Sequence, residues 1–347
     1  MVNVNVSIII KVFKLNISLY GYELPLTQSI SLKGKLLDSR QGIVISITDE
    51  TGQQRFADVA PLPGFSQNSL EECLNQLICL CEGTKHCAEL QLRARQPSLA
   101  PEVAFAIDCA LSEIGLLNSL HAPCSNEYLI PLYRKPEQEQ TQQSKQPLAQ
   151  SVSAIKVKVA NGDIEQDIAK INQVCQQYPL AKLRLDANQQ WSLIDAKYLI
   201  EQIPVDRICY IEEPCQSLTQ SIELAEQTGI KLALDESLRL MTVDELGANY
   251  SLDRIDTFVI KPSLMGSFRI IKQWLKLAKT LNIHCYLSSS FESSFGIKQL
   301  YLLHQLWQVN ALGLDTEQSF KSNLIVPAFF ENKPLISLSE LSLLWKS

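Results

Sequence analysis

The chain has 347 residues, of which 46% are hydrophobic and 20% are charged, and its formal net charge is -6. This composition can supply a packed core, and it excludes collagen, a coiled coil and long disorder. The mild acidity argues against nucleic acid or an anionic membrane as the main partner, because either favours a clustered basic surface. The length exceeds one ordinary domain of about 100–200 residues, so we expect one large domain and one smaller one.

The apolar N-terminal run Ser7–Leu19 is interrupted by Lys11 and Lys14. It is too short and too charged to span a bilayer, and it lacks the small-residue cleavage site of a secretory signal. We therefore expect a strand here, and a cytoplasmic protein with no membrane partner.

The ten cysteines show no CxxC spacing, and the four histidines are scattered. Neither a disulfide framework nor a zinc site is favoured. One cluster leaves a metal site open as an alternative: Cys73, Cys79, Cys81, His86 and Cys87. The preferred interpretation is that these are small packing residues on a helix and the loop after it.

Strand patterns come first along the chain, in three apolar or β-branched runs: Val6–Phe13, Ile30–Leu32 and Gly42–Thr48. With a turn at 49–52, they predict an antiparallel meander. Helices are predicted over 69–81 and over Pro101–Leu117, where apolar residues recur at helical spacing. Strands followed by helices predict an α+β capping domain over 1–99, joined by the C-terminal segment 321–347.

From about Tyr128 onward, short apolar strands alternate with amphipathic helices. Eight strands are predicted: Tyr128–Tyr133, Ala154–Val159, Leu183–Asp186, Cys209–Glu212, Lys231–Asp235, Thr257–Lys261, His284–Ser288 and Ala311–Leu314. Helix starts are predicted at Asp163, Ser192 and Ser217. This alternation predicts parallel pairing and a TIM-type (β/α) barrel over residues 100–320. The Gln-rich tract 135–150 is expected to be a solvated loop.

Charged residues end five consecutive predicted strands, the second to the sixth: Lys156, Lys158, Asp186, Glu212, Glu213, Asp235, Glu236 and Lys261. The C-terminal strand ends of a (β/α) barrel meet at its mouth, where the active sites of this fold lie. Structural ion pairs are the alternative, but apolar filling would serve stability as well. The pattern therefore favours an active site.

The period of two along a strand places Arg184 and Asp186 on the same inward face. Asp186, Glu212 and Asp235 on neighbouring strands would repel one another unless a cation lies among them. Oxygen ligands without His or Cys favour a hard ion, Mg²⁺ by default with Mn²⁺ as the alternative. A carboxylate substrate bound to such an ion has an acidified α-proton.

Lys158 is the candidate base for that proton. Burial, the adjacent Lys156 and the metal are each expected to favour the neutral amine that a base requires. Lys261 comes from the opposite side of the ring of strands and is either a second acid or base, or a fixed cation.

Five motifs together resemble those of the enolase superfamily, muconate-lactonizing subgroup: Lys156-Val-Lys158, Asp186-Ala-Asn188, Glu212-Glu-Pro214, Asp235-Glu-Ser237 and Lys261-Pro-Ser263. That superfamily is known for a Lys or His base used with Mg²⁺ and an ene-diolate. Within it, further segments resemble the o-succinylbenzoate synthase family: 60–66, 183–188, 211–215, 234–238 and 288–294. The similarity runs from about Leu36 to Thr316.

The resemblance implies a dehydratase of menaquinone biosynthesis. Such an enzyme converts 2-succinyl-6-hydroxy-2,4-cyclohexadiene-1-carboxylate to 2-succinylbenzoate by syn elimination, via an enediolate. Lys158 would take the α-proton and return it to the departing hydroxide, while Lys261 would stabilise the enediolate. The implied Mg²⁺ ligands are Asp186, Glu212 and Asp235.

The resemblance also implies supporting residues. Lys156 would tune Lys158, Arg184 would act near the substrate carboxylate, and Asn188 and Glu213 would lie behind the residues that touch metal or substrate. The loop carrying Gly64, Phe65 and Ser66 would close over the substrate, although Gly64 also suits an ordinary turn. The residues expected to meet the succinyl tail are Ser288, Ser289 and Ser290.

Two other functions stay open. Lysines on both faces of an enediolate equally suit an N-acylamino acid racemase or dipeptide epimerase. A non-catalytic barrel kept as a binding protein is the second, but it predicts the loss of a central lysine or carboxylate, and none is lost.

Overall fold

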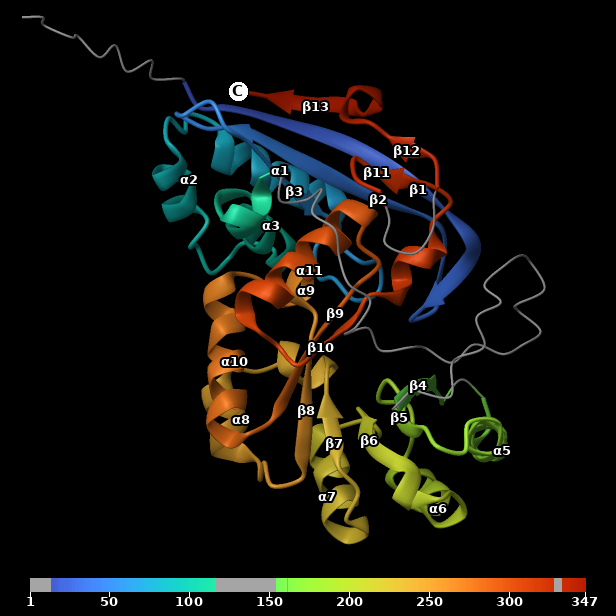
Figure 1. The fold of residues 1–347 in the computed structure, drawn as a ribbon. Coiled ribbons are helices and arrows are strands. Elements are labelled where there is room, and N and C mark those ends of the chain that lie inside the picture. The colour runs from blue at the N-terminus through green and yellow to red at the C-terminus, as the bar shows by residue number, and fades with distance from the viewer. Residues whose placement is uncertain (1–13, 117–153, 161, 328–332) are drawn as a thin grey trace, which may run out of the picture.

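Two β-sheets of different kinds organise the protein. The structure, a computed structural model, describes residues 14–116, 154–160, 162–327 and 333–347. In Figure 1 the antiparallel sheet lies across one end of the molecule, and the parallel strands with their helices lie below it. No helix within these ranges is long and apolar enough to cross a membrane.

The antiparallel sheet has the order β13-β1-β2-β3. Its strands are β1 (Asn16–Leu32), β2 (Lys35–Thr48), β3 (Gln54–Val59) and β13 (Ser342–Lys346). The predicted meander is confirmed, but β1 is far longer than the predicted Ile30–Leu32, and Val6–Phe13 lies outside the described residues. The register of β1 and β2 shifts between Pro25 and Ile30. This part of β1 is polar and contains a proline, so its sequence does not show the regular alternation of a strand.

Both faces of β2 are covered. Ile43, Ile45 and Ile47 belong to the cluster that includes the N-terminal helices, whereas Val44 packs in a second cluster with Phe295 of the last long helix. This alternation follows from the period of two along a strand. The helices on the first side are α1 (Leu70–Cys81), α2 (Cys87–Arg93) and α3 (Pro101–Leu111).

The ends of the N-terminal helices follow local chemistry. Ser69 and Glu72 form a reciprocal capping box that begins α1 at the predicted place. The helix predicted over Pro101–Leu117 ends earlier, at Leu111, because Ser112 is extended and a short 3₁₀ turn (Glu113–Gly115) follows. Gly115 packs so closely that a Cβ there would lie 2.5 Å from the Ala110 carbonyl oxygen.

The second sheet is parallel, with the order β10-β9-β8-β7-β6-β5-β4. Its strands are β4 (Ala154–Lys158), β5 (Lys182–Asp186), β6 (Ile208–Glu212), β7 (Leu232–Leu234), β8 (Ile255–Ile260), β9 (His284–Ser288) and β10 (Ala311–Gly313). Seven of the predicted strands are thus present. The sheet curls into a half-barrel that does not close within the described ranges, and the strand predicted at 128–133 and the tract 135–150 lie outside them.

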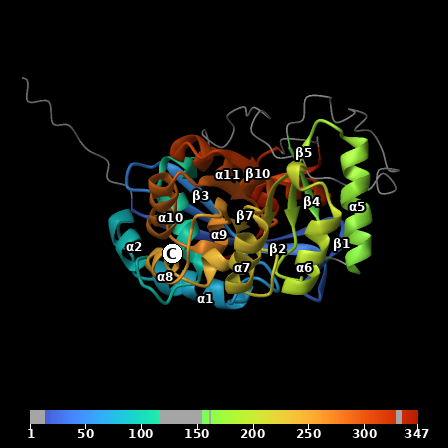
Figure 2. The ribbon, with the colours of Figure 1, turned by 90° about the horizontal axis from the view of Figure 1, so that it is seen from below.

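Helices follow the parallel strands. They are α5 (Ile164–Gln177), α6 (Leu193–Gln202), α7 (Leu218–Thr228), α8 (Val243–Asn249), α9 (Pro262–Met265), α10 (Phe268–Leu281) and α11 (Ser294–Trp307). The predicted caps Asp163, Ser192 and Ser217 each accept a backbone N–H at the start of a helix. Seen from below in Figure 2, α5, α6 and α7 follow one another around the outer side of the curved sheet.

The C-terminal segment returns to the N-terminal sheet. After the short strands β11 (Asn323–Leu324) and β12 (Leu335–Ile336), β13 pairs antiparallel with β1. In the other direction, α3 contacts both β3 and α9, so it lies between the two sheets. The domain limits at 99 and 320 stay a prediction.

Candidate active site

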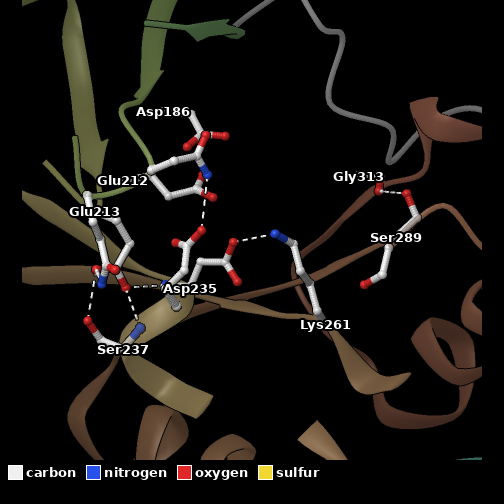
Figure 3. A network of polar contacts seen from close by, with 12 residues as sticks. Asp186, Glu212, Glu213, Asp235, Ser237, Lys261, Ser289 and Gly313 are labelled. Carbon is white, nitrogen blue, oxygen red and sulfur yellow. Dashed lines mark hydrogen bonds and ion pairs between the residues drawn. The ribbon is translucent and has the colours of Figure 1, made fainter. Parts of the chain in front are cut away.

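The C-terminal ends of the parallel strands bring the predicted charges together. Register pairs Lys158 with Asp186, and Asp186 with Glu212. Asp235 directly follows β7, and Lys261 directly follows β8. In Figure 3 the three carboxylates lie close together, and the ammonium of Lys261 points toward Asp235.

Two lysines ion-pair with these carboxylates. Lys156 Nζ lies 3.0 Å from Asp186 Oδ2 and 2.7 Å from Glu212 Oε2, and Lys261 Nζ contacts Asp235 Oδ2. All three acidic residues are buried, with at most 5% of each residue exposed. Within the described residues, no three His, Cys, Asp or Glu side chains group closely enough to hold a metal ion. Ammonium groups therefore neutralise the carboxylates here.

Each carboxylate nevertheless keeps one oxygen without a partner. Asp186 Oδ1, Glu212 Oε1 and Asp235 Oδ1 are buried and accept no hydrogen bond. An unpaired buried carboxylate oxygen is costly, so three of them near one another call for a positive ligand. Oxygen donors of this kind suit a hard divalent cation. The donor chemistry of the three carboxylates thus suits the Mg²⁺ that the sequence predicts, but in this structure they do not group closely enough to hold it.

The pKa directions point the same way. Burial, followed by the nearby Asp186 carboxylate, raises the pKa of Glu212. Burial would also raise the pKa of Asp186, but the positive charges of Lys156 and Lys158 lower it. Burial would lower the pKa of Lys156, yet its two carboxylate partners raise it well above the usual value. The lysines thus offset the burial cost of Asp186, whereas they do not offset that of Glu212.

Glu213 and Asn188 support the loops behind these carboxylates. Glu213 is fully buried and accepts hydrogen bonds from the backbone N–H groups of Asp235 (2.9 Å) and Ser237 (2.7 Å). Figure 3 shows the pair formed with the Ser237 hydroxyl at 2.8 Å. Asn188 Nδ2 donates to Glu236 Oε1 at 3.1 Å. Both residues therefore support the loops that follow the strands, and Glu213 fixes the backbone that carries Asp235.

A cavity of about 240 Å³ opens in front of the charges. Seven predicted site residues line it: Lys156, Lys158, Asp186, Glu212, Lys261, Ser288 and Ser289. Eight more lining residues were not assigned to the site from sequence: Tyr210, Val259, Tyr286, Phe291, Gly313, Asp315, Thr316 and Ser319. The period of two would have found Tyr210 and Tyr286, which precede Glu212 and Ser288 by two positions. The loop residues carry no such signal.

Lys158 differs from its prediction in one respect, because its side chain is exposed rather than buried. It is the last residue of β4, and β4 is an edge strand of the described sheet. Lys158 does line the cavity, as does Lys261, and three strands separate β4 from β8. The two lysines therefore approach one space from different sides.

Arg184 also differs from its prediction. It pairs in register with Lys156 and Tyr210, one inward position before Asp186. Its guanidinium lies 4.7 Å from the Tyr286 ring and 5.7 Å from the Tyr210 ring, and it donates to Tyr286 Oη at 3.2 Å. It thus lies beneath the cavity and supports two tyrosines of its wall, and it is not among the described lining residues.

The loop after β3 reaches the site from the other sheet. The Phe65 ring centroid lies 5.8 Å from Lys261 Nζ and 4.6 Å from Lys33 Nζ. Gly64 adopts a φ of +87°, so the turn interpretation holds, and the same turn aims Phe65 at Lys261. Ser66 Oγ donates to Glu102 and accepts from the Leu62 N–H. The loop therefore approaches Lys261, but Gly64, Phe65 and Ser66 are not among the described residues that line the cavity, and its role as a cover stays a prediction.

The serine run after β9 divides into two parts. Ser288 and Ser289 line the cavity, and Ser289 Oγ donates to the Gly313 carbonyl at 3.0 Å (Figure 3). Ser290 is buried behind the wall, where its N–H donates to Glu292 Oε2 and its hydroxyl has no partner. Two of the three predicted tail contacts thus face the cavity.

Comparisons with known proteins cover nearly the whole chain. A family model described as "Enolase C-terminal domain-like" matches residues 139–329, and one described as "MenC, N-terminal domain" matches residues 14–114. An o-succinylbenzoate synthase of Vibrio cholerae serotype O1 (strain ATCC 39315) is 34% identical over 338 residues, which cover 95% of this chain and 98% of that protein. One of Photorhabdus laumondii is 33% identical over 340 residues, with 95% and 99% covered.

Solved structures show the same fold. The o-succinylbenzoate synthase of Thermosynechococcus elongatus BP-1, complexed with Mg in its active site, has a TM-score of 0.69 and 24% identity, covering 93% of this chain and 97% of that one. The L-Ala-D/L-Glu epimerase of Bacillus subtilis has a TM-score of 0.72 and 18% identity, covering 90% and 92%. Enzymes of two activities thus share this architecture.

Proposed function

The chain belongs to the o-succinylbenzoate synthase family of the enolase superfamily, and on that premise we propose that it is a lyase that dehydrates 2-succinyl-6-hydroxy-2,4-cyclohexadiene-1-carboxylate to 2-succinylbenzoate in menaquinone biosynthesis. One observation carries the proposal for this chain. Lysines from β4 and β8 flank one cavity whose wall holds carboxylates with unpaired oxygens. That arrangement suits removal of a proton next to a substrate carboxylate.

Within this proposal each lysine has one task. Lys158 takes the proton α to the ring carboxylate as a neutral amine and returns it to the departing hydroxide. Lys261 places its ammonium beside the negative charge that develops on the enediolate. Lys156 neutralises Asp186 and Glu212, to which it is already bound. Preorganised cations stabilise developing charge because they need no reorganisation during the reaction.

A divalent metal is part of the proposal. Asp186, Glu212 and Asp235 would hold it through the oxygens that lack partners, with Mg²⁺ preferred and Mn²⁺ the alternative. When bound, the metal supplies Lewis-acid polarisation of the substrate carboxylate. Lys156 and Lys261 would then share the carboxylates with the metal.

The cavity wall would receive the rest of the substrate. Ser288 offers its hydroxyl to the succinyl carboxylate, Ser289 would do so by turning its hydroxyl away from the Gly313 carbonyl, and the loop with Phe65 covers the ring. The proposal includes a closed barrel, for which the sequence predicts one further strand, the first, at 128–133, outside the described residues. It also includes a cytoplasmic protein that acts on a small-molecule carboxylate and binds neither nucleic acid nor membrane.

The experiment incubates purified protein with the cyclohexadiene substrate and Mg²⁺ and follows the ultraviolet change on aromatisation. We expect turnover that a chelator abolishes and added Mg²⁺ restores. A protein that does not turn this substrate over contradicts the proposal. N-acylamino acids and dipeptides in D₂O provide the comparison, because α-proton exchange faster than dehydration would favour the racemase or epimerase alternative.

A further inference from the structure

Arg40 of β2 binds two loops that are far apart in the sequence. Its side chain is buried, with only 2% of the residue exposed. The guanidinium donates to the carbonyl oxygens of Pro61 and Ala60 at 2.9 Å each, and to that of Phe291 at 3.2 Å. Ala60 begins what we term the cap loop (residues 60–66), and Phe291 lies in the β9–α11 loop (residues 289–293).

The cap loop is held at both ends. Arg40 binds its first two carbonyls, and Ser66 at the other end donates to the buried Glu102 of α3. Between these anchors the Leu62 carbonyl accepts from the N–H groups of Phe65 (3.0 Å) and Ser66 (2.8 Å). The Phe65 ring therefore has a defined place near Lys261.

The β9–α11 loop is strained where Arg40 binds it. Phe291, which lines the cavity, has a φ of +58°, a conformation that costs a non-glycine residue about 1 kcal/mol or more. Two buried groups support it. Arg40 donates to the Phe291 carbonyl, and the Glu292 carboxylate accepts from the Ser290 N–H on one side and the Ser263 hydroxyl on the other.

Acidic side chains around Arg40 complete the connection. Asp58, Glu292 and Glu102 each act on the guanidinium electrostatically. Asp58 accepts from the Ser293 hydroxyl at 2.7 Å and from the Ser293 N–H at 3.3 Å, at the cap of α11. A Cβ at Gly296 would lie 2.7 Å from Asp58 Oδ2, so only glycine fits against this carboxylate. The N-terminal sheet is thus joined to the start of α11.

We propose that Arg40 is a positioning residue for substrate binding, which sets the distance between the cap loop and the β9–α11 loop and so the shape of the cavity. Phe291 is among the described residues that line the cavity and Arg40 is not, so Arg40 acts through the backbone that it binds. The inference rests on the proposed dehydratase function.

The test compares Arg40→Met and Arg40→Lys with Arg55→Met. Arg55 is a matched control, because it lies on β3 of the same sheet and pairs with Asp49 at 2.8 Å without contacting either loop. For each folded protein we would measure kcat, KM, the Kd of 2-succinylbenzoate, and hydrogen exchange at residues 60–66 and 289–293. The thermal midpoint of each variant reports stability separately.

For Arg40→Met we expect KM to rise about tenfold and kcat/KM to fall about 10- to 100-fold, since small misplacements of binding groups have effects of this size. Both loops should exchange faster. Arg40→Lys keeps the charge but offers fewer fixed donors, so its KM should lie between that of the wild type and that of Arg40→Met. Arg55→Met should unfold earlier yet keep kcat/KM within about twofold.

Several outcomes would overturn the inference. They are an Arg40→Met protein with wild-type KM and loop exchange, or an Arg55→Met protein that loses as much kcat/KM. If Arg40→Met does not fold, Arg40→Lys must show the raised KM, and a normal KM refutes the role. Wild-type protein without turnover would refute the function alone, because loop exchange in Arg40→Lys still decides whether Arg40 holds the loops.

Discussion

Two groups of buried carboxylates in this protein differ in whether their oxygens have hydrogen-bond partners. At the ends of β5, β6 and β7, Asp186, Glu212 and Asp235 each keep an oxygen without a hydrogen-bond partner. At the junction between the sheets, Asp58 has partners on both oxygens, from Tyr22 on one and Ser293 on the other, and among the acids around Arg40 one carboxylate oxygen, Glu102 Oε2, lacks a hydrogen-bond partner. A buried polar group with all its hydrogen bonds made stabilises one arrangement of the chain. A buried oxygen without a partner can instead bind a ligand. We therefore expect changes at the first group to affect catalysis or metal binding, and changes at the second to affect stability.

The largest expected effect separates chemistry from stability at the cavity. Lys158→Ala should lower kcat about 10²- to 10⁴-fold, since this removes the general base, while the exposed position of Lys158 leaves stability nearly unchanged. Steady-state kinetics and a thermal melt measure the two quantities. The control is Lys231→Ala. Lys231 precedes β7, at the N-terminal ends of the parallel strands, and pairs with Asp256. Retained activity in Lys158→Ala would show that the base lies elsewhere.

At the junction the expected loss is in stability. Asp58→Ala should cost about 3–5 kcal/mol of unfolding free energy, because Arg40 loses a buried counter-charge and Tyr22 and Ser293 lose their acceptor. Denaturant titration at constant pH measures it. Asp38→Ala is the control, an exposed carboxylate on β2 of the same sheet, bonded to Ser29. A cost below about 1 kcal/mol would mean that the junction does not depend on Asp58 and its hydrogen bonds.

A smaller effect sharpens the assignment of the metal. Asp235→Asn should weaken Mg²⁺ binding at least about tenfold, since a charged oxygen ligand becomes neutral while the amide keeps its size. Calorimetric titration with Mg²⁺ alone measures this affinity without any turnover. Asp256→Asn, at the other end of the sheet beside Lys231, should bind Mg²⁺ as the wild type does. Equal affinity in all three proteins would remove Asp235 from the metal site.

Much of the parallel half was predictable because its patterns are local. Apolar runs of strand length, helix caps such as Asp163 and Ser217, and charges at the ends of five successive strands can all be read within a few residues. The same logic failed for β1, whose regularity is broken near Pro25, and for the helix that stops at Leu111. The shape of β1 depends on its pairing with β2, and the helix ends where Arg55 of β3 donates to the Ser112 carbonyl.

By itself, the sequence determined which chemistry the protein carries: two lysines and three carboxylates at successive strand ends, spaced by single βα steps. Only the tertiary structure decided how that chemistry is enclosed. The exposure of Lys158, the place of Arg184 beneath two tyrosines, and the connection that Arg40 makes between residues 60 and 291 depend on contacts between distant segments. Strand periodicity is a short-range property of the backbone, whereas the shape of a cavity depends on how separate sheets pack.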